Sequence, residues 1–260
     1  MAKERIVIYN ESEIAGIRAA AQAAAQVLAR TCAAVRPGLS TKDIDDLAGS
    51  FIRETGGKSA SLGYHGYPGQ ICISINEEVV HGIGRPQRII AEGDLVSLDV
   101  CVKYRGYVGD NARTIIAGSS ASAPEGAQRL LTVTSEALQA GIAAARAGNC
   151  VNDISSAVEQ IATAAGYGVV RDLVGHGCGK NMHEAPEVPN YRQPGRTPIL
   201  RPGMVLCIEP MINAGTGRVV IDRQDNWTVR SADQSLSAHF EHQILITDTQ
   251  AEILTWLKTA

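Results

Sequence analysis

The spacing of apolar residues predicts that the first half of the chain forms two helices and then strands. Apolar residues recur every three or four positions in residues 11–35, and Pro37 ends this pattern. A second helical pattern follows Ser40, a residue type that caps helices, and stops at Gly56. Residues 70–81 alternate loosely between apolar and polar side chains, which predicts a strand.

Residues 94–116 have the pattern of a β-hairpin. The apolar stretches Leu95–Val102 and Tyr107–Ile116 flank a turn around Arg105. The second half of the chain again places helices before strands. The pattern predicts helices over 127–145 and 151–166, and strands over 168–174, 203–213, 218–221 and 239–247.

The two halves match at a fixed offset of 110 residues. The matched positions are Gly38 and Gly148, Asp43 and Asp153, Gly56 and Gly166, and residues 93–99 and 203–209. Several matches at one spacing indicate an internal duplication, whereas helices and strands that merely recur need not keep a constant offset. We therefore expect an α+β fold in which two pseudo-symmetric helix-plus-antiparallel-sheet halves, approximately 11–120 and 121–250, form a single domain.

Composition and charge narrow the range of partners. The 260 residues are 45% hydrophobic and 20% charged, as in ordinary soluble globular proteins. The net charge is −3 and the pI is near 6.1, so there is no basic excess to favour nucleic acid or an anionic membrane.

The ends and the cysteines add expectations about location. The opening residues lack the long apolar run of a signal peptide, and polar residues interrupt the alanine-rich stretch from Ala19 to Val35. No C-x-x-C pair occurs, which argues against a zinc finger, and we expect reduced thiols in the cytoplasm. The six cysteines are Cys32, Cys72, Cys101, Cys150, Cys178 and Cys207.

The repeat superimposes two carboxylates, Asp99 and Glu209, and each ends an apolar strand pattern. Burying an unpaired carboxylate is costly, and two facing carboxylates cannot neutralise each other, so a cation between them is the simplest partner. Asp110 lies across the predicted hairpin. It is opposite Asp99 if residues 104 and 105 form the turn, and it stays on the same face if the register moves by two.

Two further residues complete a candidate metal site. Glu241 lies in the predicted strand next to that of Glu209, and His176 stands between two glycines that bring the backbone close without packing against the ring. Four carboxylates and one imidazole suit two divalent ions such as Mn, Fe, Co or Zn, with at least one bridging carboxylate. A metal pair about 3.5–4 Å apart can generate hydroxide at neutral pH, which predicts hydrolysis of an amide or ester.

The segments that carry these residues resemble, in order and spacing, the metal-site motifs of type I methionine aminopeptidases. They are SLDV at 97–100, GD at 109–110, GHGCG at 175–179, IEPM at 208–211 and SLSAHFEH at 235–242. Residues 64–84 resemble the substrate-side segment of the same family, and the likeness covers nearly the whole chain. The resemblance implies the pita-bread fold and removal of initiator methionine when the second residue is small and uncharged.

The resemblance also implies a role for each site residue. Asp99 would bind one metal, His176 and Glu209 would bind the other, and Asp110 and Glu241 would bridge the two. Glu209 would in addition carry a proton from bound water to the leaving amine.

Two histidines and an apolar pocket would handle the substrate. His81 and His183 would contact the scissile amide and stabilise the developing oxyanion, although a structural or surface role is the alternative for each. The side chains that would receive methionine are Tyr64, Tyr67, Cys72 and Trp227, whose aromatic and sulfur groups suit a thioether. The alternative for Trp227 is a place in the ordinary core.

The family further implies nascent polypeptide N-termini as partners, at the ribosome, and a monomeric enzyme. Two positions depart from its pattern: Met182 stands where an aromatic residue is common, and Val108 where histidine is frequent. Prolidases, aminopeptidase P and creatinase share the fold but carry a large extra N-terminal domain. Type II enzymes insert a long segment between the last two glutamates, which are only 32 residues apart here. A non-catalytic binding module of this fold typically loses ligands, and all five are present.

Overall fold

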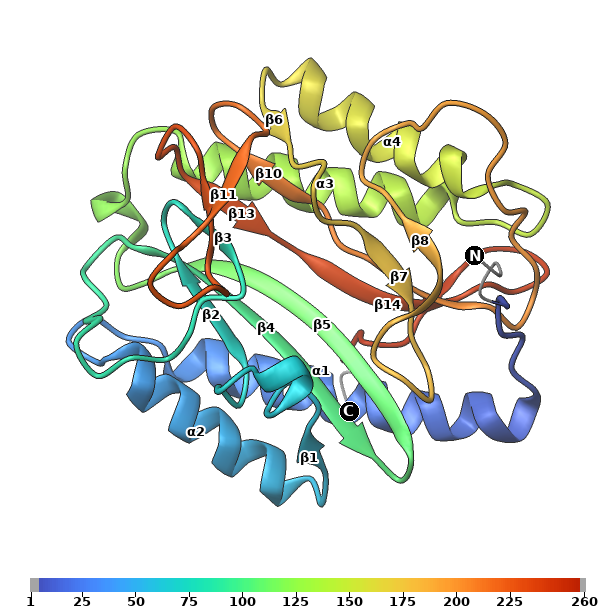
Figure 1. Ribbon diagram of the computed structural model, residues 1–260, viewed down its shortest axis with the longest axis horizontal. Coiled ribbons are helices and arrows are strands. Elements are labelled where there is room, and N and C mark those ends of the chain that lie inside the picture. The colour runs from blue at the N-terminus through green and yellow to red at the C-terminus, as the bar shows by residue number, and fades with distance from the viewer. Residues whose placement is uncertain (1–4, 258–260) are drawn as a thin grey trace.

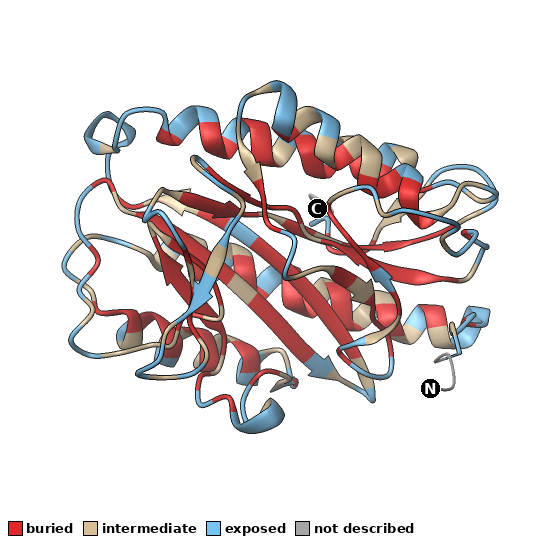
Figure 2. Ribbon diagram, turned by 45° about the horizontal axis from the view of Figure 1, so that its top comes forward, coloured by how far each residue is buried: buried red, intermediate tan, exposed pale blue. Residues whose placement is uncertain are grey.

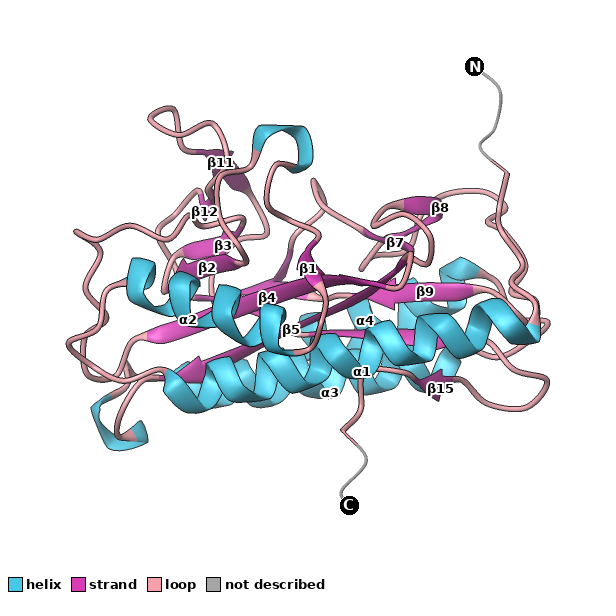
Figure 3. Ribbon diagram, turned by 90° about the horizontal axis from the view of Figure 1, so that it is seen from below, coloured by secondary structure: helices cyan, strands magenta, loops and turns pink. Residues whose placement is uncertain are grey.

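The computed structural model describes residues 5–257, in which four helices cover one face of an antiparallel sheet (Figure 1, Figure 3). Loops and short strands gather on the opposite face. No helix among the described residues has the length and apolarity that a membrane crossing requires. The helices are α1 (Glu11–Ala34), α2 (Thr41–Glu54), α3 (Ala127–Ala144) and α4 (Val151–Ala164), with short 3-10 turns at Tyr64–Gly66 and Ser120–Ser122.

The main sheet has nine strands in the order β1-β4-β5-β14-β9-β7-β8, with β2 paired to β4 and β15 paired to β14. Its strands are β1 (Lys58–Ser59), β2 (Cys72–Ile75), β4 (Leu95–Tyr104), β5 (Tyr107–Ile116), β7 (Gly175–Gly177), β8 (Glu184–Val188), β9 (Val205–Ile208), β14 (Glu241–Leu245) and β15 (Glu252–Ile253).

Two three-stranded sheets complete the structure, in the orders β13-β10-β6 and β11-β12-β3. Their strands are β3 (Glu78–Val80), β6 (Gly168–Val169), β10 (Met211–Asn213), β11 (Val219–Ile221), β12 (Val229–Ser231) and β13 (Ser237–His239).

Local features recur at the 110-residue offset. The glycines that follow α1 and α3, Gly38 and Gly148, both have φ near +90°, a conformation that glycine adopts without strain. The residues that precede α2 and α4 each form an isolated antiparallel bridge to a later isoleucine: Ser40 pairs with Ile89, and Cys150 with Ile199. Equivalent turns therefore place the helices on the sheet in both halves.

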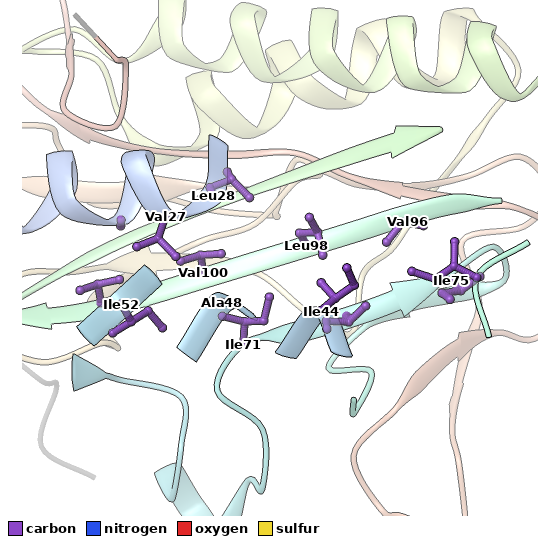
Figure 4. Close-up of a cluster of buried hydrophobic side chains, with 14 of the residues drawn as sticks. Val27, Leu28, Ile44, Ala48, Ile52, Ile71, Ile75, Val96, Leu98 and Val100 are labelled. Atoms are coloured by element: carbon purple, nitrogen blue, oxygen red, sulfur yellow. The ribbon is translucent and has the colours of Figure 1, made fainter. Parts of the chain in front are cut away.

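Side chains of β4 point alternately to the helix-covered face of the sheet and to the opposite face. Val96, Leu98 and Val100 point into the cluster formed with α1 and α2 (Figure 4), and the buried faces of the helices follow the sheet (Figure 2). Since successive side chains of a strand point to opposite faces, Asp99 and Cys101 face away from the helices. The helices thus bury one face of the strand while the other face remains available for polar groups.

Two predicted strands are broken at the same level of the sheet. The segment 203–213 is divided at Glu209 and Pro210 into β9 and β10, and 239–247 is divided at Phe240 into β13 and β14. Proline has no backbone N–H to donate to a ladder, and the Phe240 amide donates instead to the Pro210 carbonyl at 3.4 Å. The chain passes there from the main sheet to a small one, with Glu209 and Glu241 beside the break.

Shorter elements differ more from the predictions. Residues 70–81 form β2 and β3 around a turn at Asn76, whose φ is 58°. Of residues 168–174 only the first two form a strand. The strands β7, β8 and β12 were not predicted, because segments of three to five residues carry almost no periodicity.

Candidate metal centre

The register of three adjacent strands brings three carboxylates together on the sheet face away from the helices. Tyr104 pairs with Tyr107, so the hairpin turn lies at residues 105 and 106. Asp99 is therefore opposite Ala112. Asp110 lies two residues before Ala112 in β5, nearer the turn and on the same face. Ala112 also pairs with Glu241 of β14, which places that carboxylate next to the two aspartates.

His176 and Glu209 approach this group from β7 and the end of β9. The His176 ring nitrogen Nδ1 lies 3.0 Å from the Gly177 carbonyl, which can only accept, so Nδ1 carries the proton. The other nitrogen, Nε2, then presents a lone pair 3.2 Å from Glu209 Oε1 and 4.0 Å from Asp110 Oδ2. Lone pairs that face each other at these distances repel, and a cation between them removes the repulsion.

The glycines beside His176 are required by the close packing of the backbone. A Cβ at Gly175 would collide with the Cys207 carbonyl of the neighbouring strand, and one at Gly177 with the Ala185 carbonyl. The segment can therefore pair closely with β9 and hold the imidazole against the carboxylates.

Burial disfavours the charged form of each carboxylate in the cage. Burial raises the pKa of Asp99 to about 6. Burial and the negative charge of Asp99 together raise the pKa of Asp110 to about 8. The pKa values of Glu209 and Glu241 lie well above their usual range for the same two reasons, burial first and then the charge of Asp110.

Two oxygens of this cage have no hydrogen-bond partner. Among residues 5–257, nothing donates to Glu209 Oε1 or Glu241 Oε1, although both atoms are buried. Burial of an unpaired polar atom costs about 1–3 kcal/mol, so these oxygens indicate a missing partner. Carboxylate oxygens and an imidazole nitrogen are ligands that suit divalent manganese, iron, cobalt or zinc, and the donor set therefore fits such ions.

A cavity of about 160 Å³ opens directly above the carboxylates. It is of the order of a cavity that holds a benzene-sized ligand, roughly 150 Å³. The same cavity is lined by all the residues predicted from the sequence to bind metal or substrate: Tyr64, Tyr67, Cys72, His81, Asp99, Asp110, His176, His183, Glu209, Trp227 and Glu241.

The aromatic wall is held in place by specific contacts. The buried Tyr67 donates its hydroxyl to the Gly82 carbonyl at 2.7 Å, and its ring meets the Trp227 ring edge-on at 5.2 Å. Tyr64 Oη lies 2.7 Å from His183 Nδ1. Cys72 is nearly buried, and burial raises the pKa of its thiol well above the usual range, so this residue offers a neutral sulfur surface.

Two histidines line the cavity. His81 has a left-handed backbone with φ of 60°, and burial lowers the pKa of its ring to about 4. His183 stands at the exposed rim with its ring 4.2 Å from that of His176, and partial burial lowers its pKa also. Both imidazoles are therefore neutral at pH 7 and can donate a hydrogen bond without carrying charge.

His239 is a site residue that the sequence analysis did not single out. It is 2% exposed, its Nε2 lies 3.7 Å from Glu209 Oε2, and neither ring nitrogen has a hydrogen-bond partner within residues 5–257. Burial lowers its pKa to about 3. The sequence did contain a signal for His239: it lies two residues before Glu241, and residues two apart in a strand share a face.

The two departures from the family pattern have different locations. Met182 lines the cavity and is nearly buried, so it contributes a flexible thioether to the wall. Val108 is buried beside the site, where it packs with three cysteines and with Met182.

Stability of the metal-free protein is expected to fall between about pH 7 and pH 8. Burial and the charge of Asp99 raise the pKa of Asp110 to about 8, so this carboxyl keeps its proton in the folded state through most of this window. The pKa values of Glu209 and Glu241 are raised in the same direction, by burial first. Unfolded carboxyls lose their protons near pH 4, and unfolded histidine titrates near pH 6.5, so in this window the carboxyls dominate. Their stabilisation is complete at low pH and is lost as pH rises through the folded pKa, at roughly 1 kcal/mol per pH unit for each retained proton.

The measurement is urea unfolding of chelator-treated protein at both pH values, with and without added Mn²⁺. The bound cation favours the charged carboxylates and should reverse the trend. If the metal-free protein were as stable at pH 8 as at pH 7, or more stable, the raised carboxyl pKa values would be wrong.

Comparison with known proteins places the chain in a family. Residues 15–248 match the model of metallopeptidase family M24. A methionine aminopeptidase of Clostridium acetobutylicum is 46% identical over 250 residues, covering 96% of this chain and 98% of that protein. The methionine aminopeptidase of Escherichia coli is 39% identical over 254 residues, covering 97% and 95%.

Solved structures agree in fold. The crystal structure of methionine aminopeptidase from Thermotoga maritima superimposes with a TM-score of 0.93 at 40% identity, covering 97% of this chain and 100% of that one. A prolidase from Pyrococcus furiosus, at 23% identity and a TM-score of 0.78, shares the fold alone and is matched over 66% of its length.

A metallopeptidase is the class that this fold and this buried acidic cage define. The chain belongs to metallopeptidase family M24, has the pita-bread fold, and is a metal-dependent aminopeptidase of the kind represented by the methionine aminopeptidases.

Proposed function

We propose that the protein hydrolyses the bond after an N-terminal methionine and releases that residue from nascent proteins. The observation that carries this proposal is a cavity whose floor is the carboxylate–imidazole cage and whose wall is aromatic and sulfur-bearing. The floor suits metal-assisted hydrolysis, and the wall suits a thioether side chain. The names of the relatives support the same activity.

The cage would hold two divalent ions drawn from manganese, iron, cobalt and zinc. Asp99 would bind the first ion, and His176 and Glu209 the second. Asp110 and Glu241 would bridge both. When bound, the ions would act as Lewis acids on the scissile carbonyl and lower the pKa of water.

The residues around the cage divide the remaining tasks. His81 and His183, which are neutral and line the cavity, would donate hydrogen bonds to the carbonyl oxygen as negative charge develops there. Glu209, with its raised pKa, would hold the proton released by water and deliver it to the leaving amine. The apolar wall excludes water from the methionine side chain.

We expect cleavage of Met-Ala, Met-Gly and Met-Ser peptides and rejection of Met-Leu, Met-Lys and N-acetyl-Met peptides. The free amine must reach the acidic cage, where an acetyl group clashes, and the second residue must pass the rim beside His81. Rejected peptides should fall by at least about 100-fold in kcat/KM, since steric exclusion exceeds apolar discrimination.

The assay is methionine release from a peptide series that differs only at the second residue, with Ala-Ala-Ser as the control for the first position. Rapid hydrolysis of Met-Leu or acetyl-Met peptides would refute the specificity while leaving the metal chemistry intact. Equal hydrolysis of Ala-Ala-Ser would refute the methionine pocket.

The setting of the reaction is part of the proposal. The two halves, approximately 11–120 and 121–250, would act as one catalytic domain in a monomer. The substrates would be polypeptide N-termini emerging from the ribosome in the cytoplasm, and the net charge of −3 supports the expectation that neither nucleic acid nor a membrane is a direct partner.

A further inference from the structure

Three cysteine thiols lie against the metal cage without belonging to the predicted ligand set. Cys101, Cys178 and Cys207 pack with Val108 and Met182 in one buried cluster next to the cavity. Cys101 also lines the cavity itself. All three are free thiols, so their sulfur atoms are available for contacts with the cage.

Cys101 touches both aspartates. It is paired with Asp110 across the hairpin and is two residues from Asp99 on the same face. Its Sγ lies 2.8 Å from Asp110 Oδ1 and 3.6 Å from Asp99 Oδ1. Ligand atoms of these three residues lie within 4.8 Å of one another, which is close enough for one ion to contact all three.

Cys207 stands on the other side of Asp110. Ligand atoms of Asp110, His176, Cys207 and Glu241 all lie within 4.8 Å of one another, and all four residues are buried except for a small part of His176. One nitrogen, one sulfur and two carboxylate oxygens form the type of set that binds zinc tetrahedrally.

A protonated thiol is only a weak hydrogen-bond donor to the carboxylates of the cage. Within residues 5–257, Glu209 Oε1 and Glu241 Oε1 are buried without a hydrogen-bond partner, so the neighbouring thiols do not satisfy the cage. These unpaired oxygens are a second indication that the cage takes a cation.

We propose that Cys101 and Cys207 extend the cage into a mixed sulfur, oxygen and nitrogen site that takes a thiophilic divalent cation, Zn²⁺ or Cd²⁺. The inference rests on the metal centre of the proposed function and names the class of ion that this particular chain prefers. Each coordinating thiol forms a sulfur–metal bond and releases its proton to solvent, so the ion replaces one proton per thiol. Thiolate ligands shift selectivity from manganese toward softer ions.

The first test uses Co²⁺ added to the metal-free full-length protein. A thiolate bound to Co²⁺ produces a sulfur-to-metal charge-transfer band in the near ultraviolet, which oxygen and nitrogen ligands do not produce. The expected result is such a band in the wild type, weakened in Cys101→Ser and Cys207→Ser and absent in the double variant. The serine hydroxyl keeps a hydrogen-bond donor beside each carboxylate, so its effect reports loss of sulfur alone.

The second test compares affinities for Cd²⁺ and Mn²⁺ by calorimetry. Each serine variant should bind Cd²⁺ about 10- to 100-fold more weakly, the range found for groups that support a metal site, while Mn²⁺ binding stays unchanged. Cys32→Ser is the matched control, because Cys32 packs against the helix-side core and should affect neither ion. The cadmium NMR shift of the wild-type protein reports sulfur ligation without any variant.

Absence of the charge-transfer band in the wild type, or its survival in the double variant, would overturn the proposal. Equal weakening of Cd²⁺ and Mn²⁺ binding would also overturn it, since that pattern means that the thiols only orient the carboxylates. None of these results would refute the proposed hydrolysis of Met-Ala peptides, which is assayed separately. Conversely, a sulfur-ligated ion in a protein that cleaves no Met-Ala peptide would refute the proposed function alone.

Discussion

Metal-free protein is expected to release no methionine from a Met-Ala-Ser peptide, and Mn²⁺, Co²⁺ or Fe²⁺ should restore turnover. The cage contains four carboxylates and one neutral imidazole, two of its carboxylate oxygens are buried without a partner, and no lysine or arginine of residues 5–257 lines the cavity. Lowering the pKa of water and polarising the carbonyl both require the ion. The measurement is turnover after chelation and after titration with each metal.

Asp110→Asn should reproduce the effect of chelation within one chain. The change keeps the size of the side chain but removes the charge that lies nearest to the other ligands, so both metal content and turnover should fall together. Asp46→Asn, at an exposed position on α2, is the matched control and should leave both unchanged. Full turnover by metal-free protein would exclude the metal mechanism altogether.

His81→Ala and His183→Ala are each expected to lower kcat by about 10²–10³-fold, the cost of removing one oxyanion donor. Both rings line the cavity, and both are neutral donors at pH 7 because burial lowers their pKa values. Neither is assigned to the metal, so metal content should remain at the wild-type level. Single-turnover kinetics with Met-Ala-Ser, together with metal analysis, checks both statements.

The left-handed backbone of His81 calls for a second variant. Alanine is strained at a φ of 60°, whereas asparagine tolerates that conformation, so His81→Asn removes the imidazole and keeps the loop. His65→Asn is the control, because His65 is also left-handed and its ring contacts Tyr64 at 4.4 Å. Loss of bound metal in either cavity variant would make that histidine a ligand and would require a new division of roles.

Long elements with a strong period could be predicted from the sequence, because their signal is local. The helices α1 to α4 and the hairpin of β4 and β5 were predicted within one or two residues of their observed ends. Their apolar residues repeat at the spacing of one face, and proline, glycine and capping residues mark their limits. The order of Asp99, Asp110, His176, Glu209 and Glu241 along the chain was also readable, because each follows or occupies a strand pattern.

The register of the hairpin was left open by the sequence, since both turns keep Asp99 and Asp110 on one face. Tertiary pairing decided that Cys101, and not Asp99, is opposite Asp110. The interruption of two strands at Pro210 and Phe240 depends on hydrogen bonds between segments about 30 residues apart, which periodicity does not record. The contacts of His239 and of the cysteines arise in the same way.

The sequence by itself determined which side chains are available and which strand face each occupies, because alternation and helical spacing follow from covalent geometry and burial. Only the tertiary structure decided how closely those side chains approach one another. Distances between residues on different strands depend on register, strand breaks and close backbone packing at positions such as Gly175, and these are properties of the assembled sheets. The same packing sets the desolvation that raises the carboxylate pKa values, and so makes the cage a site for cations.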